Sequence, residues 1–371
     1  MRFPEFTKEW EEHALAEYLD FKNGLNPDVK RIGRGLPFIS VMDILADGTI
    51  NYDSIRGKVE ATEREIENFS VEKGDILFQR SSETLEDVGR ANVYMDNRTA
   101  VYGGFVIRGR KIGDYNPLFF KYLLSTPLAR KRTCRMGAGA QHFNIGQDGL
   151  SKISLCFPLM EEQNKIARLL SLIDERIATQ NKIIEKLQSL IKGLRVCCMQ
   201  RNGSNNVYLS EIAQIYQPQT ISSAELTEDG FLVYGANGII GKYKDYNHKT
   251  EQICITCRGN TCGMVNYTKP MSWITGNAMV INTDKYQDKV YKKYLYHYLS
   301  AYNFNSIISG SGQPQIVRTP LEKLKITLPT ISEQKQKAMI LDKVQDKIEI
   351  NHNILNLYIL QKQYLLRQMF I

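Results

Sequence analysis

The chain has 371 residues, of which 43% are hydrophobic and 24% are charged, and this composition is typical of a globular protein with more than one core. It contains no run of about 18 apolar residues and no apolar signal core near its start, so neither a membrane span nor export is expected and a cytoplasmic location is favoured. The seven cysteines are scattered as free thiols would be, and the net charge of +8 favours an anionic partner.

The first half of the chain has an ordered series of predicted elements. A strand is predicted at 74–80 ("GDILFQR"), an amphipathic helix at 117–126 ("PLFFKYLLST") and a glycine-rich loop at 137–144 ("GAGAQHFN"). A second strand follows at 150–158 ("LSKISLCFP"), where apolar residues alternate with the period of a strand that has one buried face. Its final proline ends the strand, because proline cannot donate to the ladder of a sheet.

Basic residues gather in the same half. Between Gly104 and Arg135 there are eight basic residues and one acidic residue. Attraction to phosphate is local and is screened within roughly 8–10 Å in physiological salt, so a cluster is stronger evidence for a nucleic-acid partner than net charge is. An ordinary basic surface remains the alternative interpretation.

A long helix is predicted at 159–200. Its apolar residues recur at alternating steps of four and three, which is the heptad pattern of a coiled coil, and the one polar exception is Gln180. The expected seam residues are Ile166, Leu170, Ile173, Ile177, Gln180, Ile184 and Leu187. About 35 residues of helix would span roughly 52 Å, which is longer than one turn of B-DNA at about 34 Å. We therefore expect a rod that can hold two modules apart, and an amphipathic helix lying on a domain is the alternative.

The second half repeats this order. A strand is predicted at 251–258 ("EQICITCR"), a helix at 290–300, a glycine-rich loop at 310–316 ("GSGQPQI") and a strand ending in proline at 321–329 ("LEKLKITLP"). Because the landmarks recur while the sequences between them differ, the chain is predicted to contain two modules of one architecture with different targets.

The second long helix, predicted at 330–371, matches the first at an offset of 171 positions. Seven residues are identical at this offset, and they include the Glu-Gln pairs at 162–163 and 333–334. The expected seam residues are Leu341, Val344, Ile348, Asn351 and Leu355, with Lys337 and Lys362 in expected apolar positions. Asn351 corresponds to Gln180, and two polar residues at matched seam positions can fix the register by pairing.

Motifs that would carry catalysis are incomplete. The segment 116–120 ("NPLFF") lacks the second proline of the motif in amino-methylating DNA enzymes, and 235–243 ("GANGIIGKY") departs from a phosphate-binding loop at two positions. Cys254, Cys257 and Cys262 have no fourth ligand at a spacing typical of zinc sites. No nucleophile–base pair or nuclease-like pair of acids is evident, so an enzyme acting alone is disfavoured and no cofactor or metal is expected.

These motifs together resemble a known family. The segments "ISLCFPLMEEQNKIARLLSLIDERI" and "LKITLPTISEQKQKAMILDKVQDKI", the run "VYGANGIIGKY" and the two glycine-rich loops are similar to those of Type I restriction-modification specificity subunits, over essentially the whole length. The resemblance implies an α+β fold with two pseudo-repeated target-recognition domains joined by two long antiparallel helices that form a coiled coil. We place the domains at 1–158 and 201–329, and the spacer helices at 159–200 and 330–371.

The resemblance also implies a function. Each domain would read one half of a split site in double-stranded DNA, and the two helices would set the gap between the half-sites. The subunit would do no chemistry itself but would recruit adenine methyltransferase (modification) subunits and restriction/translocase subunits. A coiled-coil structural adaptor without a DNA-reading role is the alternative, against which the basic cluster and the divergent module interiors argue.

Candidate DNA-binding residues follow the predicted strands and occupy the glycine-rich loops. Arginine suits guanine, asparagine and glutamine suit adenine, and glycine lets the backbone approach a partner closely. The candidates in the first module are Arg80, Ser81, Arg90, Arg130, Lys131, Arg132, Arg135, Gln141, His142 and Asn144. Those in the second module are Lys242, Lys244, Arg258, Asn260, Thr261, Gln313 and Gln315. For each of them, a solvated or scaffold side chain is the alternative interpretation.

Overall fold

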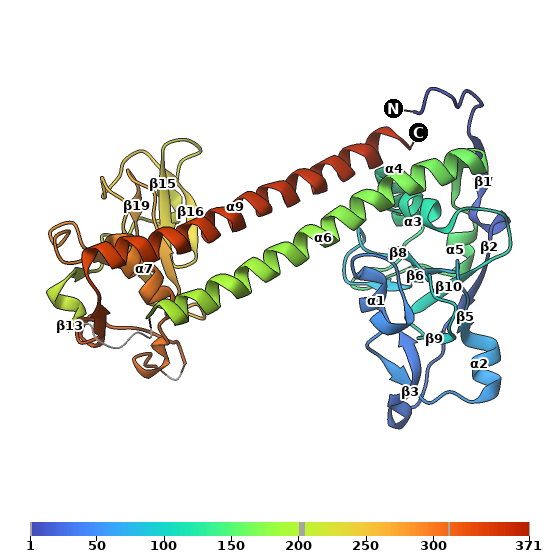
Figure 1. The fold of residues 1–371 in the computed structure, drawn as a ribbon. Helices are drawn as coiled ribbons and strands as arrows, with labels where there is room; N and C mark the ends of the chain where they lie inside the picture. The colour runs from blue at the N-terminus through green and yellow to red at the C-terminus, as the bar shows by residue number, and fades with distance from the viewer. Residues whose placement is uncertain (1, 200–204, 311, 371) are drawn as a thin grey trace. The chain divides into compact units, whose positions relative to one another are not determined.

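The computed structural model describes residues 2–199, 205–310 and 312–370. The chain divides into two compact units, unit 1 from residues 1–181 and 354–371 and unit 2 from residues 182–353. Each unit therefore contains one α/β module and part of each long helix, α6 (Met160–Met199) and α9 (Ile331–Gln368), which Figure 1 shows in green and red. No helix within the described ranges is long and apolar enough to cross a membrane.

Module 1, the α/β part of unit 1, is built on a four-stranded antiparallel sheet. Its strand order is β2 (Leu19–Asn23), β10 (Val106–Lys111), β6 (Ile76–Gln79) and β8 (Ala91–Val93). All four residues of the central strand β6 are buried, because helix α3 (Pro117–Ser125) and the core aromatic residues cover this sheet.

A second sheet in module 1 has the order β4 (Lys58–Val59), β3 (Ile32–Ile39), β9 (Ala100–Tyr102) and β5 (Ser70–Val71), with β3 and β9 parallel. The pair β1 (Glu11–Ala14) and β12 (Ser154–Phe157) brings the two ends of the module together. The smaller elements are η1 (Leu15–Glu17), η2 (Val29–Arg31), α1 (Val41–Leu45), η3 (Tyr52–Ser54), α2 (Glu63–Phe69), β7 (Ser81–Ser82), α4 (Pro127–Cys134), β11 (Phe143–Asn144) and α5 (Gln147–Ser151).

Module 2, the α/β part of unit 2, repeats this topology. Its four-stranded antiparallel sheet has the order β14 (Gln214–Tyr216), β20 (Ala278–Asn282), β17 (Ile253–Thr256) and β18 (Val265–Tyr267), which matches β2-β10-β6-β8 strand for strand. The central strand of its second, three-stranded sheet has one antiparallel and one parallel neighbour. An antiparallel pair of strands again brings the two ends of the module together. The remaining elements are β13 (Asn205–Tyr208), η4 (Leu209–Glu211), η5 (Ser223–Glu225), β15 (Phe231–Gly235), β16 (Gly238–Tyr243), β19 (Trp273–Ile274), α7 (Lys292–Ala301), η6 (Phe304–Ser306), α8 (Arg318–Glu322) and β21 (Lys325–Leu328).

The repeated glutamine after each strand-ending proline anchors the long helix to its module. Gln163 accepts a hydrogen bond from the backbone amide of Asn116 at 3.0 Å and donates to the carbonyl of Pro158 at 3.0 Å. Gln334 does the same with the amide of Tyr291 at 2.8 Å and the carbonyl of Pro329 at 2.9 Å. Both glutamines are buried, and each binds the N-terminal capping residue of an earlier helix of its module, α3 or α7. This shared contact explains why the sequence repeats the pair Pro and Gln.

The two long helices run antiparallel in each unit. In unit 1, Lys362 Nζ lies 2.5 Å from Asp174 Oδ1, and Arg176 lies 3.3 Å from the hydroxyl of Tyr358. In unit 2, Lys337 Nζ donates to the carbonyl of Cys198 at 2.9 Å. Residue numbers rise along one helix as they fall along the other, which is the expected antiparallel arrangement. The two lysines in apolar seam positions are thus accommodated by partners on the facing helix.

The heptad residues lie on the inner side of the helices. In unit 1, Ile166, Leu170 and Ile173 join a core that includes Leu365 and Met369 of α9. In unit 2, a separate cluster packs the two helices together, from Leu187, Ile191, Leu194, Leu341, Val344 and Ile348. Gln180 and Ile184 are buried, whereas Ile177, Asn351 and Leu355 are half-buried. The pairing of Gln180 with Asn351 stays a prediction, because these residues belong to different units.

Candidate nucleic-acid interface

The two glycine-rich loops fold into equivalent hairpins. Ala138 and Asn144 exchange two backbone hydrogen bonds of 2.9 Å, and Ser309 and Gln315 exchange bonds of 2.9 and 2.8 Å at the same offset of 171 positions. Each hairpin needs one glycine. Gly139 has a φ of 142° and Gly310 has a φ of 93°, and a Cβ added to Gly310 would lie only 2.4 Å from the carbonyl oxygen of Gln313.

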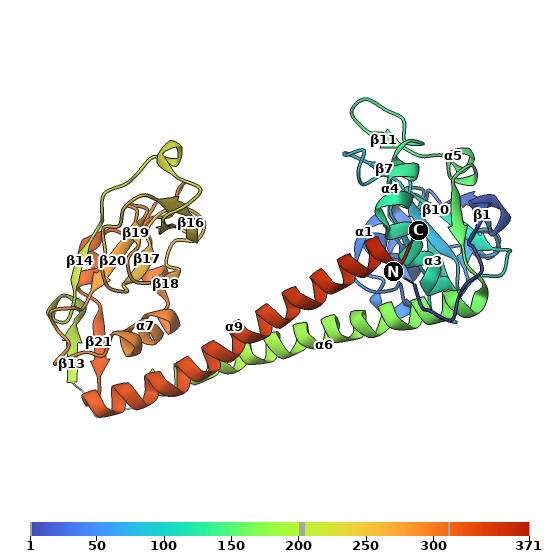
Figure 2. The ribbon, with the colours of Figure 1, turned by 90° about the horizontal axis from the view of Figure 1, so that it is seen from above.

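Each hairpin is bound to the point where the central strand of its sheet ends. The amide of Ile145 donates to the carbonyl of Arg80 at 3.0 Å, just after β6. The amide of Ile316 donates to the carbonyl of Cys257 at 3.0 Å, just after β17. These bonds make Ser81 the structural equivalent of Arg258, and Asn144 the equivalent of Gln315. Figure 2 shows β7 and β11, which carry the first pair, on the side of module 1 away from α6.

Most of the candidates in these loops are exposed at the hairpins. Gln141, His142 and Asn144 are exposed in module 1, and Arg258, Asn260, Gln313 and Gln315 are exposed in module 2. Ser81 Oγ donates to Asn144 Oδ1, so the two side chains form one polar surface. Arg258 and Gln315 pair through their backbones as an isolated bridge, which places their side chains together in the same way.

The "GANG" turn between β15 and β16 lies beside the loop that follows β17. Thr261 Oγ1 bonds to Asn237 of this turn, and Thr256 Oγ1 donates to the carbonyl of Ala236. Lys242 Nζ lies 3.4 Å from Asp229 Oδ1, whereas Lys244 is exposed next to the ring of Tyr243. The turn that resembles a phosphate-binding loop is therefore a hairpin that supports the loop after β17.

The basic side chains of the run 130–135 differ in whether they are bonded inside module 1 or exposed. Arg130 donates to the carbonyls of Glu86 and Val88 at 2.8 and 2.6 Å, and burial lowers its pKa. Arg132 bonds to Glu12 Oε1 at 2.6 Å and to the carbonyl of Ser154. Both guanidinium groups thus hold parts of module 1 together, contrary to the expectation of a free basic face, while Arg135 is exposed beside the hairpin.

Arg90 and Lys131 line a basic pocket of about 510 Å³ in unit 1 rather than the hairpin. Lys121 and Lys362 also line it, and burial, reinforced by repulsion from Lys362, lowers the pKa of Lys121 to about 8. Arg90 pairs with Asp87 at 2.6 Å, whereas Lys131 is exposed. Attraction to Asp174, which also pairs with Lys362, opposes the pKa shift of Lys121. The cationic side chains of the pocket outnumber its acidic ones, Asp47 and Glu86, and this balance favours an anion.

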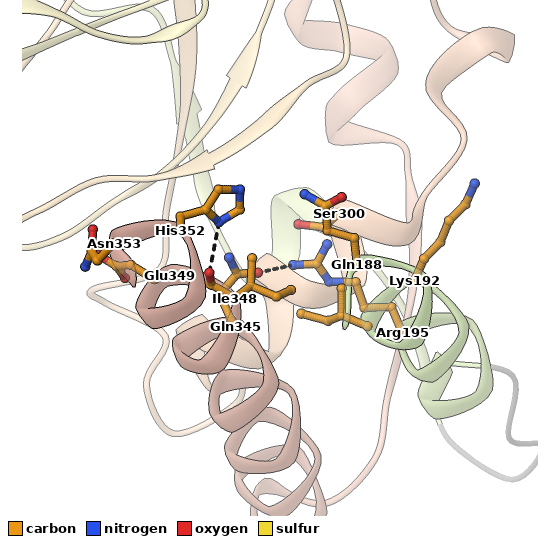
Figure 3. Close-up of a pocket in the computed structure, with 10 residues that line it drawn as sticks. Gln188, Lys192, Arg195, Ser300, Gln345, Ile348, Glu349, His352 and Asn353 are labelled. Carbon is orange, nitrogen blue, oxygen red and sulfur yellow. Dashed lines mark hydrogen bonds between the residues drawn. The ribbon is translucent and has the colours of Figure 1, made fainter. Parts of the chain in front are cut away.

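A polar groove of about 660 Å³ lies in unit 2 between α6, α9 and the end of α7 (Figure 3). Arg195 reaches across it to Gln345 Oε1 at 3.5 Å, and His352 Nδ1 bonds to the carbonyl of Ile348 in its own helix at 2.9 Å. The groove thus exposes polar groups of both long helices next to module 2.

A buried histidine next to this groove connects module 2 with both helices. His297 of α7 is fully buried, with Nε2 2.9 Å from Asp342 Oδ1 of α9 and Nδ1 3.3 Å from Nε of Arg195 in α6. An arginine nitrogen can only donate, so Nδ1 accepts and the proton of a neutral ring lies on Nε2. Burial lowers the pKa of His297, and although the hydrogen bond to Asp342 opposes this shift, repulsion from Arg195 and Lys293 adds to it. Figure 2 shows α7 beside the first half of α9, a contact that helical spacing alone does not signal.

The cysteines of module 2 belong to its interior. Cys254 and Cys257 are buried, burial raises the pKa of the Cys254 thiol, and Cys257 Sγ lies 3.2 Å from the carbonyl of Asn277. Within residues 2–199, 205–310 and 312–370, no group of three His, Cys, Asp or Glu side chains is arranged to hold a metal ion.

Comparisons with known proteins agree with the repeated architecture. The family model described as "Type I restriction modification DNA specificity domain" matches residues 7–189 and 202–357. The Type I restriction enzyme MjaVIII specificity subunit of Methanocaldococcus jannaschii is 25% identical, over 94% of this chain and 88% of its own. The EcoprrI specificity subunit of Escherichia coli is 32% identical, over 36% of this chain and 34% of its own.

Two solved structures share the fold. The crystal structure of a Type I restriction-modification S subunit from M. genitalium has a TM-score of 0.68 at 16% identity, with 100% of this chain and 99% of that chain covered. A structure described under complex assembly and conformational transition of the Type I restriction-modification system has a TM-score of 0.58 at 14% identity, with 98% and 97% covered. The family match covers both modules and most of both long helices, and the chain therefore belongs to the Type I restriction-modification DNA specificity family.

Proposed function

We propose that the chain is a sequence-specific DNA-binding subunit that reads a bipartite site, with one module for each half-site. One observation carries this proposal. The same hairpin and strand end occur twice with closely matching backbone hydrogen bonds, but they carry the half-buried Ser81 and the exposed Asn144 in one module, and the exposed Arg258 and Gln315 in the other. A constant scaffold with different exposed polar side chains is what two readers of different sequences need.

The chemistry of these side chains fits base edges in the major groove. Arg258 can bind the O6 and N7 of guanine with two hydrogen bonds, and Asn144 and Gln315 can bind adenine in the same manner. Exposed cations nearby, such as Arg135 and Lys244, would contact phosphates, which set the position of the protein but carry no sequence information. The basic pocket lined by Lys131 would add a further phosphate contact in module 1.

The long helices would recruit the other subunits. In unit 1, Leu357, Leu360 and Tyr364 recur at steps of three and four along α9, and each is more than half exposed. A row of exposed apolar residues on one helix is typical of a surface that a partner covers. We assign this face to the adenine methyltransferase, with the restriction/translocase subunit joining the assembled complex. The chain itself would have no catalytic role and no cofactor.

The first experiment is binding of the complex, assembled with its methyltransferase, to a library of randomised duplexes, followed by sequencing of the bound fraction. The expected result is one split motif with two defined halves. Arg258→Ala should weaken binding by about 1–3 kcal/mol and relax the preference in one half only. Arg318→Ala is the matched control, because Arg318 is also exposed in unit 2 but pairs with Glu322.

The structural adaptor makes the opposite prediction. It requires assembly with partners but no enrichment of any DNA sequence. A normally assembled complex that enriches no sequence from the library would therefore favour the adaptor. An unchanged motif for Arg258→Ala would remove this arginine from the set of readers while leaving the proposed function intact.

A further inference from the structure

The turn that precedes β10 in module 1 has a direct counterpart before β20 in module 2. The amide of Arg80 donates to the carbonyl of Phe105 at 2.9 Å, and the amide of Cys257 donates to the carbonyl of Asn277 at 3.2 Å. Arg80 and Cys257 are the same residues whose carbonyls hold the two hairpins. Three segments therefore meet at each site: the end of the central strand, the hairpin, and this turn.

Both residues at this position are exposed. The Phe105 side chain is 69% exposed, and Asn277 is also exposed. The backbone of the turn is held in place, because Gly103 donates to the carbonyl of Ile39 at 3.0 Å and Val106 donates to that of Gly103 at 2.8 Å. A single exposed apolar residue is ordinary on a protein surface. The position of Phe105, beside the residue that anchors the hairpin, is what distinguishes it.

We propose that Phe105 and Asn277 are a third matched pair of specificity-determining residues, in addition to Ser81 with Arg258 and Asn144 with Gln315. This inference rests on the proposed function. Phe105 offers only apolar surface, and the apolar group that the major groove presents is the 5-methyl group of thymine. The side-chain amide of Asn277 can donate to N7 of adenine and accept from its N6 amino group. Each module thus presents three side chains from three chain segments to its half-site.

The proposal predicts how the loss of a single chemical group from the DNA changes the affinity. The motif bound by the wild-type complex is determined first, and each thymine of the half-site read by module 1 is then replaced by uracil, which lacks only the methyl group. One replacement should lower wild-type affinity about fourfold, which corresponds to about 0.8 kcal/mol for a buried methyl group. The same replacement should leave the affinity of Phe105→Ala unchanged.

Matched variants separate this role from a general loss of binding. Ile112→Ala is the control in module 1, because Ile112 is 61% exposed and lies at the far end of β10. Asn277→Ala should lose sensitivity to 7-deazaadenine at one position of the other half-site only. Because Phe105 and Asn277 are exposed, both variants should melt at the temperature of the wild type.

Three results would overturn the inference. They are a half-site for module 1 without thymine, a uracil effect that persists in Phe105→Ala, and a wild-type motif in either single variant. These results are distinct from failure of the proposed function, in which the wild-type complex itself would select no motif. Enrichment of a motif by the wild type together with an unchanged Phe105→Ala preference would reject only the third pair.

Discussion

Replacing Gln163 by alanine tests the contact that the repeated sequence motif encodes. The side chain of Gln163 joins the first turn of α6 to Asn116, the capping residue of α3, through one hydrogen bond and donates a second to the carbonyl of Pro158, and it is almost entirely buried. Alanine would leave the amide of Asn116 and the carbonyl of Pro158 without these partners. An unpaired buried polar group costs about 1–3 kcal/mol. We therefore expect the free energy of unfolding of unit 1 to fall by about 2–4 kcal/mol.

The two tryptophans of the chain allow each unit to be followed separately. Trp10 packs edge-on against Phe119 of α3 in unit 1, with ring centroids 6.0 Å apart, and Trp273 packs against Tyr243 in unit 2 at 5.0 Å. Trp273→Phe leaves a fluorescent reporter in unit 1, and Trp10→Phe leaves one in unit 2. When Gln163→Ala is unfolded by denaturant in both backgrounds, the decrease in the free energy of unfolding should appear in the background that retains Trp10.

Two controls make the result decisive. Asn164→Ala removes the neighbouring exposed side chain of α6, which accepts one hydrogen bond of 2.7 Å from the side chain of Asn116, and should lower the free energy of unfolding by only about 0.5–1.5 kcal/mol, because this bond is exposed to water. Gln334→Ala breaks the equivalent contact and should report at Trp273 instead. The reasoning would be refuted if Gln163→Ala were no more destabilising than Asn164→Ala, or if its effect were larger at Trp273 than at Trp10.

Three further perturbations test the hairpin, the buried histidine and the helix pair. Gly310→Ala should lower the melting temperature and the affinity for one half-site, because its Cβ would lie 2.4 Å from the Gln313 carbonyl; Gly312→Ala, with open space around it, should not. Below the ordinary histidine pKa near 6.5, the unfolded chain binds a proton that folded His297 resists, so unit 2 should lose stability between pH 7.5 and 5.5. An equal loss in His297→Gln would contradict this origin. Leu341→Asp places a charge in the fully buried helix contact of unit 2 and should prevent assembly with the methyltransferase, whereas retained assembly in a pull-down would show that the helix pair is not required.

The repeated order of elements follows from local sequence patterns. Alternating apolar residues predict the strands that end at Pro158 and Pro329, and the heptads predict α6 and α9, because burial of one face imposes a period that is visible in a single stretch of chain. The offset of 171 positions likewise appears in the hairpin bonds of Asn144 and Gln315. These features can be predicted without knowing which distant residues are in contact.

The roles of individual basic residues depended on partners far away in the chain. Arg132 was indistinguishable from Arg135 in the sequence, but Arg132 bonds to Glu12, 120 positions before it, whereas Arg135 is exposed. The basic run therefore overestimated the free positive charge of module 1, since a charge count does not show which guanidinium groups meet carbonyls or carboxylates inside the fold.

The sequence by itself thus determined the two modules, their glycine-rich hairpins and the two long helices, because periodicity, proline and glycine act locally. Only the tertiary structure decided which side chains share one surface. The equivalence of Phe105 and Asn277 arises from the registers of β10 with β6 and of β20 with β17, which pair residues more than twenty positions apart. Such pairings follow from the packing of whole sheets, so no single stretch of sequence reveals them.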